Sequence, residues 1–192
     1  APVAFAVPDP FQLASELAAL THGHPTAYLT SGFFTSLLSS LLHDPSLAKA
    51  VDEASRPLTR YSHYKGCLNA VQAATRHAEK APPTAESVEK LRRGWGADEA
   101  LTIALYCALT APSFEDGVRL AVNHSGASNH TGALAGQILG LRFGRTSIPQ
   151  SWLESVELRM VVEEIAQDMA QHFGQDAQMG PKIYDYNKYP TY

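Results

Sequence analysis

The sequence has little cysteine, little net charge and no long apolar run, and each absence argues against a class of protein. Its two cysteines, Cys67 and Cys107, lie in apolar helical patterns, so we expect buried free thiols rather than a disulfide or a metal pair. A net charge of -4 gives no electrostatic reason to expect nucleic acid or an anionic membrane as a partner. No apolar run reaches the roughly 18 residues of a membrane span. Residues 1–11 lack the layout of a signal peptide, so a cytoplasmic protein is expected.

Length and composition set the scale of the fold. A chain of 192 residues with 45% hydrophobic and 18% charged residues has the composition of an ordinary soluble globular protein. It is long enough for one domain with a substantial buried core. Apolar residues recur with the helical period nearly everywhere, and no alternating strand pattern of useful length occurs. The sequence therefore predicts an all-α fold.

Capping residues and prolines place the expected helices. Asp9-Pro10 and Asp44-Pro45 each give a cap followed by proline in the first helical position. Thr84 follows a proline-rich loop, and Ser113 with Asp116 resembles a capping box. With the apolar period, these signals predict helices over residues 11–20, 25–42, 44–57, 64–80, 84–92, 97–111, 114–123, 131–143 and 158–173.

One expected helix carries glycine at every fourth position, at Gly132, Gly136, Gly140 and Gly144. Because each glycine inside a helix costs about 1 kcal/mol relative to alanine, the stripe predicts a face packed closely against another backbone. On that interpretation, Gly136→Leu destabilises the fold by several kcal/mol. A second interpretation is that the first glycine leaves room for an anionic ligand at the helix amino terminus, and both can hold at once.

The most informative segment is residues 124–132, which read His-Ser-Gly-Ala-Ser-Asn-His-Thr-Gly. It resembles the carboxy-terminal signature of the ADP-ribosylglycohydrolase family, which reads roughly His-Ser-Gly-Asp-Ser-Asp-Ser-Thr-Gly and binds two divalent cations. Segments 20–25, 94–101 and 187–190 are similar to further family motifs in the same order, so the resemblance covers nearly the whole chain. It implies a compact helical domain over residues 1–174, truncated at its amino terminus, with a tyrosine-rich tail over residues 175–192. The family's Gly-Asp-Ala and Thr-Asp-Asp motifs do not occur in this sequence.

The resemblance also implies a degenerate metal site. In the family the cations are held by oxygen ligands that suit magnesium or manganese. At the corresponding positions Ala127 has no ligand atom, Asn129 has a neutral carbonyl oxygen, and Thr131 has only a hydroxyl. His130 replaces a serine and has no matched partner for zinc or nickel. We therefore expect no catalytic residue and no cofactor, with Mg or Mn bound only if the chain is an enzyme.

Substrate-binding positions are carried over from the family at His22, Ser125, Gly126 and Thr131. His22 corresponds to the family position nearest the ribose, although a structural role in the turn between two helices is equally compatible with the sequence. For Trp95, core packing is favoured over a place above a pocket. Asp98 and Glu99 open a helix, where negative side chains are favoured, and are expected to be structural.

Two functions are compatible with these residues. The favoured one is a catalytically inactive, ADP-ribosylglycohydrolase-like binding protein, for example an immunity or regulatory protein acting against an ADP-ribosyltransferase, with residual ADP-ribose binding. The alternative is an ADP-ribosylglycohydrolase, half of a split or altered enzyme, that removes ADP-ribose from modified side chains with a two-metal centre.

A protein partner or self-association is expected in either case. Because the resemblance implies a missing amino-terminal half, a face of the 25–42 and 97–111 helices is expected to lie uncovered. The candidates for that face are Phe33, Phe34, Leu37 and Tyr106. A complex burying at least about 1,200 Å² in total is expected to cover it. The tyrosine-rich tail either packs on the domain or contributes to such an interface.

Overall fold

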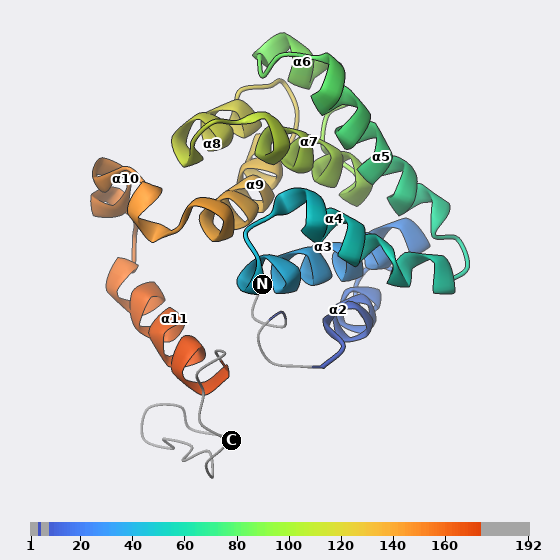
Figure 1. Cartoon of the computed structure of the whole chain (residues 1–192), viewed down its shortest axis with the longest axis horizontal. Coiled ribbons are helices and arrows are strands. Elements are labelled where there is room, and N and C mark those ends of the chain that lie inside the picture. The colour runs from blue at the N-terminus through green and yellow to red at the C-terminus, as the bar shows by residue number, and fades with distance from the viewer. Residues whose placement is uncertain (1–3, 5–7, 174–192) are drawn as a thin grey trace.

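The computed structural model describes residue 4 and residues 8–173, which fold as α-helices joined by short connections (Figure 1). No strand is found among these residues, so the all-α prediction is confirmed. The tail over residues 175–192 lies outside the described part. The helices are α2 (Pro10–Ala19), α3 (Pro25–His43), α4 (Leu47–Ser55), α5 (Lys65–Lys80), α6 (Ala85–Glu89), α7 (Ala97–Thr110), α8 (Phe114–Val122), α9 (Ser128–Phe143), α10 (Gln150–Ser155) and α11 (Arg159–Phe173), with 3-10 turns η1 (Pro57–Arg60) and η2 (Arg145–Ser147).

The core is built around α3, α7 and α9. These three helices pack on one another, while α2 and α4 cover α3, α5 covers α7, and α8 packs against both α7 and α9. Both α3 and α7 are apolar on most sides, which a helix in the interior of a domain requires. The largest fully buried side chains come mainly from α3, α7 and α9: Leu29, Phe33, Leu37, Leu38, Leu101, Ile103, Leu105, Tyr106, Ile138 and Leu139.

This arrangement overturns the prediction of an uncovered face on α3 and α7. Phe33, Leu37 and Tyr106 are fully buried, and Phe34 is nearly so. The Tyr106 hydroxyl donates to the carbonyl of Pro82 across 2.6 Å, so its polar end is also satisfied inside the chain. The prediction was wrong because helices of this same chain cover both elements.

The predicted caps are largely confirmed. The Asp9 carboxylate accepts from the Gln12 amide at the start of α2, and Thr84 caps α6 in the same way. The Ser113 hydroxyl accepts from the backbone of Asp116 and donates to its carboxylate. The helix predicted from residue 44 differs from its prediction. Helix α4 begins at Leu47, and Ser46 rather than Asp44 is its N-cap residue.

Helix α9 differs from its prediction in two ways. It begins at Ser128, three residues earlier than expected, so half of the signature loop is helical. The glycine stripe is not a packed face, because a Cβ at Gly136 or Gly140 would meet nothing within 4 Å, and Gly144 is the residue that follows the helix, with φ +79°. Only Gly132 meets a neighbour, Val122 of α8. The expected destabilisation by Gly136→Leu therefore loses its basis.

Both cysteines are buried free thiols, as predicted. Burial raises the pKa of each thiol to about 12, which keeps them protonated and unreactive. Among the described helices, none has the length and apolar character needed to cross a membrane.

Candidate functional site

The signature segment forms a tight loop between α8 and α9, and the ring of His124 organises it. The Gly126 amide donates to Nδ1 of His124 across 3.1 Å, so Nδ1 carries no hydrogen. The hydrogen of the neutral ring is therefore on Nε2, which donates to the Thr131 hydroxyl across 2.8 Å. One side chain thus joins the start of the loop to its middle and to the second turn of α9.

Thr131 lies beneath the loop with its hydroxyl fully engaged. The side chain is 0% exposed, and its hydroxyl donates to the carbonyl of Ala121 across 2.6 Å while accepting from His124. A hydroxyl has one hydrogen to give, and here the α8 backbone receives it. As arranged here, Thr131 connects α8, the loop and α9 and does not present its oxygen to a ligand.

Ser125 is held by a carboxylate from a distant part of the chain. Its amide and its hydroxyl both donate to the two oxygens of Glu89, across 2.6 Å and 2.9 Å. These bonds, first from the amide and then from the hydroxyl, lower the pKa of the Glu89 carboxyl below its ordinary value of 4.5. The last residue of α6 thereby clamps the exposed side of the loop.

The loop also lies directly against the segment that precedes α7. The Ala127 amide donates to the carbonyl of Arg93 across 2.8 Å. A Cβ at Gly126 would lie 1.9 Å from that same oxygen, so only glycine permits the approach. Residues 89–93 and 124–127 therefore form a fixed pair of segments.

The residues present do not fit a pair of divalent cations. Ala127, 3% exposed, caps α9 without any side-chain hydrogen bond and offers no ligand atom. Asn129 and His130 are exposed in the first turn of α9, and neither carries a carboxylate. In the described part of the chain, no group of three or more His, Cys, Asp or Glu side chains is placed to hold a metal ion. The carboxylate charge that two such cations require is absent from this loop.

The structure places the predicted substrate-binding residues in two regions. Ser125, Gly126 and Thr131 share the loop, whereas His22 lies in the turn after α2, where its Nδ1 contacts the Thr21 hydroxyl across 2.8 Å. Within residues 8–173, no hydrogen bond or ion pair joins that turn to the loop. The binding roles of these residues stay predictions. His24 is the amino-terminal cap of α3, accepting from the Thr26 amide.

Trp95 is 72% exposed, so the prediction that it packs in the core is wrong. It lies between two glycines just before α7, and its amide donates to the carboxylate of Glu99. Glu99 also pairs with Arg92, which agrees with the structural role expected for that residue. Trp95 therefore adds exposed apolar surface two residues after Arg93, whose carbonyl holds the loop.

Sequence reasoning missed two groups of this site, the Glu89 carboxylate and the Arg93 carbonyl. Glu89 lies 36 residues from Ser125, and it ends a short helix that shows no feature of a binding motif. A backbone carbonyl carries no sequence signal at all. Gly126 is the one local hint, because a glycine in a tight loop is compatible with a close backbone neighbour, although it does not identify that neighbour.

Comparisons with known proteins agree with the resemblance seen in the sequence. The family model for ADP-ribosylglycohydrolase matches residues 1–178. ADP-ribosylarginine hydrolase Tri1 of Pseudomonas putida (strain GB-1) is 26% identical over 84 residues, which are 44% of this chain and 23% of that protein. A solved structure titled "ADP-ribosylglycohydrolase-related protein complex" superposes with a TM-score of 0.67 at 28% identity, over 88% of this chain and 56% of that one. The chain thus spans little more than half the length of that structure.

Proposed function

Because this chain belongs to the ADP-ribosylglycohydrolase family, we propose that it is a binding protein that retains the helical domain without the hydrolytic chemistry. The observation that carries the proposal is the signature loop. Ala127 and Asn129 stand where the family has metal-binding aspartates, and the Thr131 hydroxyl is committed to His124 and Ala121. Without carboxylates, the loop lacks the means to hold the cations that would activate water.

What remains at the loop favours recognition. Its fold is fixed by hydrogen bonds that its backbone amides donate to Glu89, His124 and Arg93, so its surface is preorganised. Asn129 and His130 are exposed on that surface and can donate or accept hydrogen bonds. We propose ADP-ribose, or a side chain that carries it, as the ligand. An immunity or regulatory role against an ADP-ribosyltransferase is the corresponding proposed biological role.

Calorimetry with ADP-ribose, with and without magnesium, tests the proposal. The expected result is a heat of binding that does not depend on magnesium, together with no release of ADP-ribose from ADP-ribosylated arginine. Asn129→Ala/His130→Ala is expected to weaken binding. Gln137→Ala, farther along α9 with its side chain bonded only to its own helix, is the matched control. Turnover that a chelator abolishes would overturn the proposal.

The second candidate is hydrolysis, and the similarity to an ADP-ribosylarginine hydrolase favours it. The matched region is a minor part of that enzyme, so this function requires further residues to supply the metal ligands. An assay of ADP-ribosylarginine cleavage in manganese and in magnesium separates the two candidates directly. We place the binding protein first because the loop of this chain has no carboxylate.

A further inference from the structure

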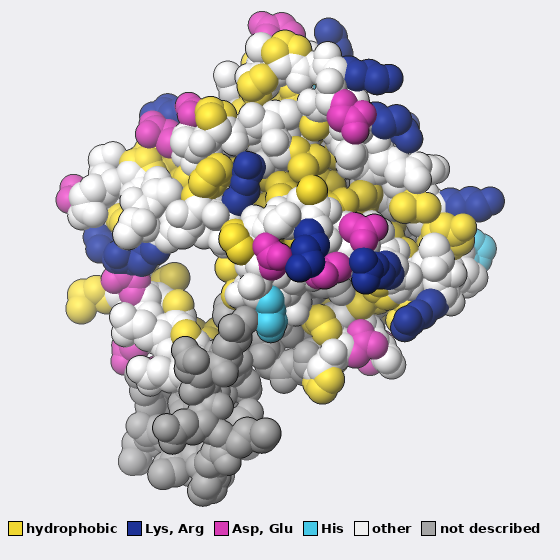
Figure 2. Space-filling model, viewed as in Figure 1, with side chains coloured by type: hydrophobic (Ala, Val, Ile, Leu, Met, Phe, Trp, Pro, Cys, Tyr) yellow, Lys and Arg dark blue, Asp and Glu magenta, His cyan; other side chains and the backbone are white. Residues whose placement is uncertain are grey.

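Positive charge is concentrated in one part of this acidic chain. Residues 60–93 carry seven lysines and arginines against three glutamates, although the whole chain has a net charge of -4. One of those glutamates, Glu89, is already bonded to the signature loop. Figure 2 shows dark blue Lys and Arg side chains along the edge of the molecule that α5 occupies in Figure 1. The charge of this region is therefore opposite in sign to that of the chain as a whole.

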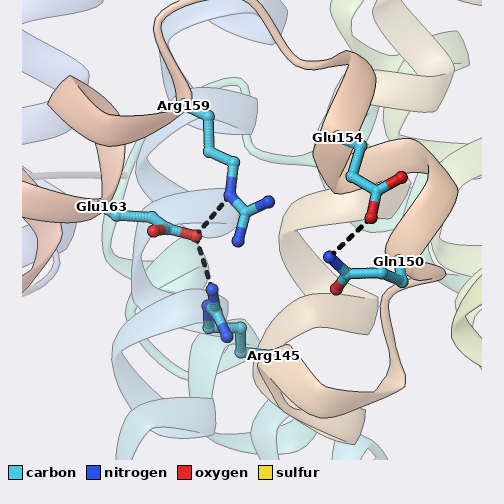
Figure 3. A network of polar contacts seen from close by, with 5 residues as sticks. All are labelled: Arg145, Gln150, Glu154, Arg159 and Glu163. Atoms are coloured by element: carbon cyan, nitrogen blue, oxygen red, sulfur yellow. Dashed lines mark hydrogen bonds and ion pairs between the residues drawn. The ribbon is translucent and has the colours of Figure 1, made fainter.

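Most of these cations have no carboxylate partner. Elsewhere in the described chain lysines and arginines are mostly paired, and Arg145 and Arg159 even share Glu163 (Figure 3). Within residues 60–93, all of which are described, Arg92 alone is in an ion pair. A cation without a carboxylate of its own chain is available to a carboxylate of another molecule. The cations in this condition are Arg60, Lys65, Arg76, Lys80, Lys90 and Arg93.

Two of the unpaired cations line a hollow of about 440 Å³ beside α5. Arg76 comes from α5 and Lys90 from the turn after α6, and both side chains are exposed. The Arg76 guanidinium contacts the neutral Gln72 amide across 3.4 Å, and Glu86, one turn before Lys90, forms no ion pair with it. We call this hollow, which lies between α5, residues 90–92 and the first turn of α7, the α5 groove. Its volume is in the range of ligand sites.

The two sides of the α5 groove differ in chemistry. Small side chains line the α5 side, at Gly66, Ala70 and Ala73, so another chain can approach the helix closely there. Carboxylates line the α7 side, where Glu99 is neutralised by its ion pair and Asp98 is outside any ion pair of the described residues. The groove therefore offers two free cations and one free hydrogen-bond acceptor around a smooth floor.

We propose that the α5 groove binds an acidic segment of a partner protein. Carboxylates of such a segment can accept charge-assisted hydrogen bonds from Arg76 and Lys90. Its backbone amides can donate to Asp98, and a phosphodiester backbone has no such donor. A nucleic acid fits less well for two further reasons. None of the residues that line the groove is aromatic, so bases have no ring to stack on, and the Asp98 charge repels a row of phosphates.

The α5 groove and the signature loop share residues 89–93. Lys90 and Arg92 line the groove, whereas the Glu89 carboxylate and the Arg93 carbonyl hold the loop. A partner in the groove therefore contacts the segment that fixes the loop. This inference goes beyond the proposed binding function, because it gives the protein a second surface with a polypeptide ligand. It does not require ADP-ribose to bind.

Fluorescence polarisation of the full chain with a fluorescein-labelled octaglutamate peptide tests the proposal. Wild type is expected to bind the peptide saturably, with an affinity that falls as salt is added. Arg76→Glu/Lys90→Glu is expected to weaken binding by at least about tenfold, because both charge-assisted contacts are lost. Lys49→Glu/Arg56→Glu makes the same change in net charge at two cations that are already paired, and is expected to bind like wild type. No binding by wild type, or equal losses in the two variants, would overturn the proposal.

Two further measurements keep the result specific. Labelled octathymidylate is expected to bind at least about tenfold more weakly than octaglutamate, and tighter binding of the oligonucleotide would overturn the choice of a polypeptide. Arg76→Gln/Lys90→Gln removes the charges without introducing repulsion and is also expected to weaken peptide binding. If the glutamate variant loses helix content by circular dichroism, the glutamine variant decides. Calorimetry with ADP-ribose is expected to be unchanged in both variants, so the groove and the proposed function fail separately.

Discussion

The His124 ring donates from Nε2 to the Thr131 hydroxyl across 2.8 Å, and this bond joins the signature loop to the helix that follows it. The same hydroxyl donates to the α8 backbone, so one buried oxygen connects three elements. The resemblance predicts a binding role for Thr131, and in the structure its hydroxyl joins α8, the loop and α9.

Thr131→Val removes this junction without a large change in volume. It leaves Nε2–H of His124 and the carbonyl of Ala121 without their partner, so we expect a loss of about 1–3 kcal/mol in the free energy of unfolding. Urea denaturation measures it. Thr75→Val is the control, because the Thr75 hydroxyl bonds only to its own helix. Equal effects of the two substitutions would refute the role of Thr131.

Two glycines of the same region should respond in opposite directions to alanine. Gly126→Ala places a Cβ against the Arg93 carbonyl and is expected to destabilise the fold by about 1–3 kcal/mol. Gly136→Ala meets open space in the middle of α9 and should stabilise it by up to about 1 kcal/mol through helix propensity. Thermal melting of both variants checks the pair. A destabilised Gly136→Ala would mean that this face is covered after all.

The Glu89 clamp should be sensitive to acid. The pKa of the Glu89 carboxyl is lower in the folded chain than its ordinary value of 4.5. Its contribution is therefore present above pH 4.5 and is lost as the pH falls through the lower, folded value. Hydrogen exchange at the Ser125 amide should accelerate in Glu89→Ala at neutral pH, and this difference from wild type should shrink in acid. Glu79→Ala, an exposed glutamate of α5, serves as the control. A difference that persists unchanged below the folded pKa would contradict the clamp.

Restoring the carboxylates tests why the loop does not fit a metal. Ala127→Asp/Asn129→Asp should gain a manganese-dependent rise in melting temperature, because two carboxylates then face the same short loop. Ala127→Asn, with similar size and no charge, should show no such rise. A manganese-dependent rise in wild type would mean that other residues hold the cation, and would count against the binding protein.

The sequence was most informative where local signals decide the structure. Pro25 and the glycine before Ala97 mark where α3 and α7 begin, and the apolar runs that follow are longer than a strand. The ranges of both helices were therefore predicted closely. The degenerate loop was also readable, because Ala127 and Asn129 replace specific residue types.

The errors concern contacts between distant segments. Phe33 and Tyr106 were expected on an open face, and only the packing of α2, α5 and α9 around them shows that they are buried. The glycine stripe through Gly136 was interpreted as a packed face. A four-residue period shows which residues share one side of a helix, but it does not show what lies against that side. The Glu89–Ser125 bonds span 36 residues and leave no local pattern. Figure 2 shows hydrophobic side chains interspersed with charged and polar ones over the visible face of the helical body, so surface appearance does not identify the core either.

The exposure of Trp95 has an optical consequence. The chain has two tryptophans, and their surroundings differ. The Trp95 indole is exposed to water, whereas Trp152 of α10 packs edge-on against Phe114 under the Arg119 guanidinium. Because indole emission shifts to the red in water, the two rings emit at different wavelengths. A ligand that covers Trp95 should alter the red component, and a movement of α10 away from Phe114 should alter the blue one. The fluorescence of this chain therefore distinguishes, without any label, an event at Trp95 from an event at α10.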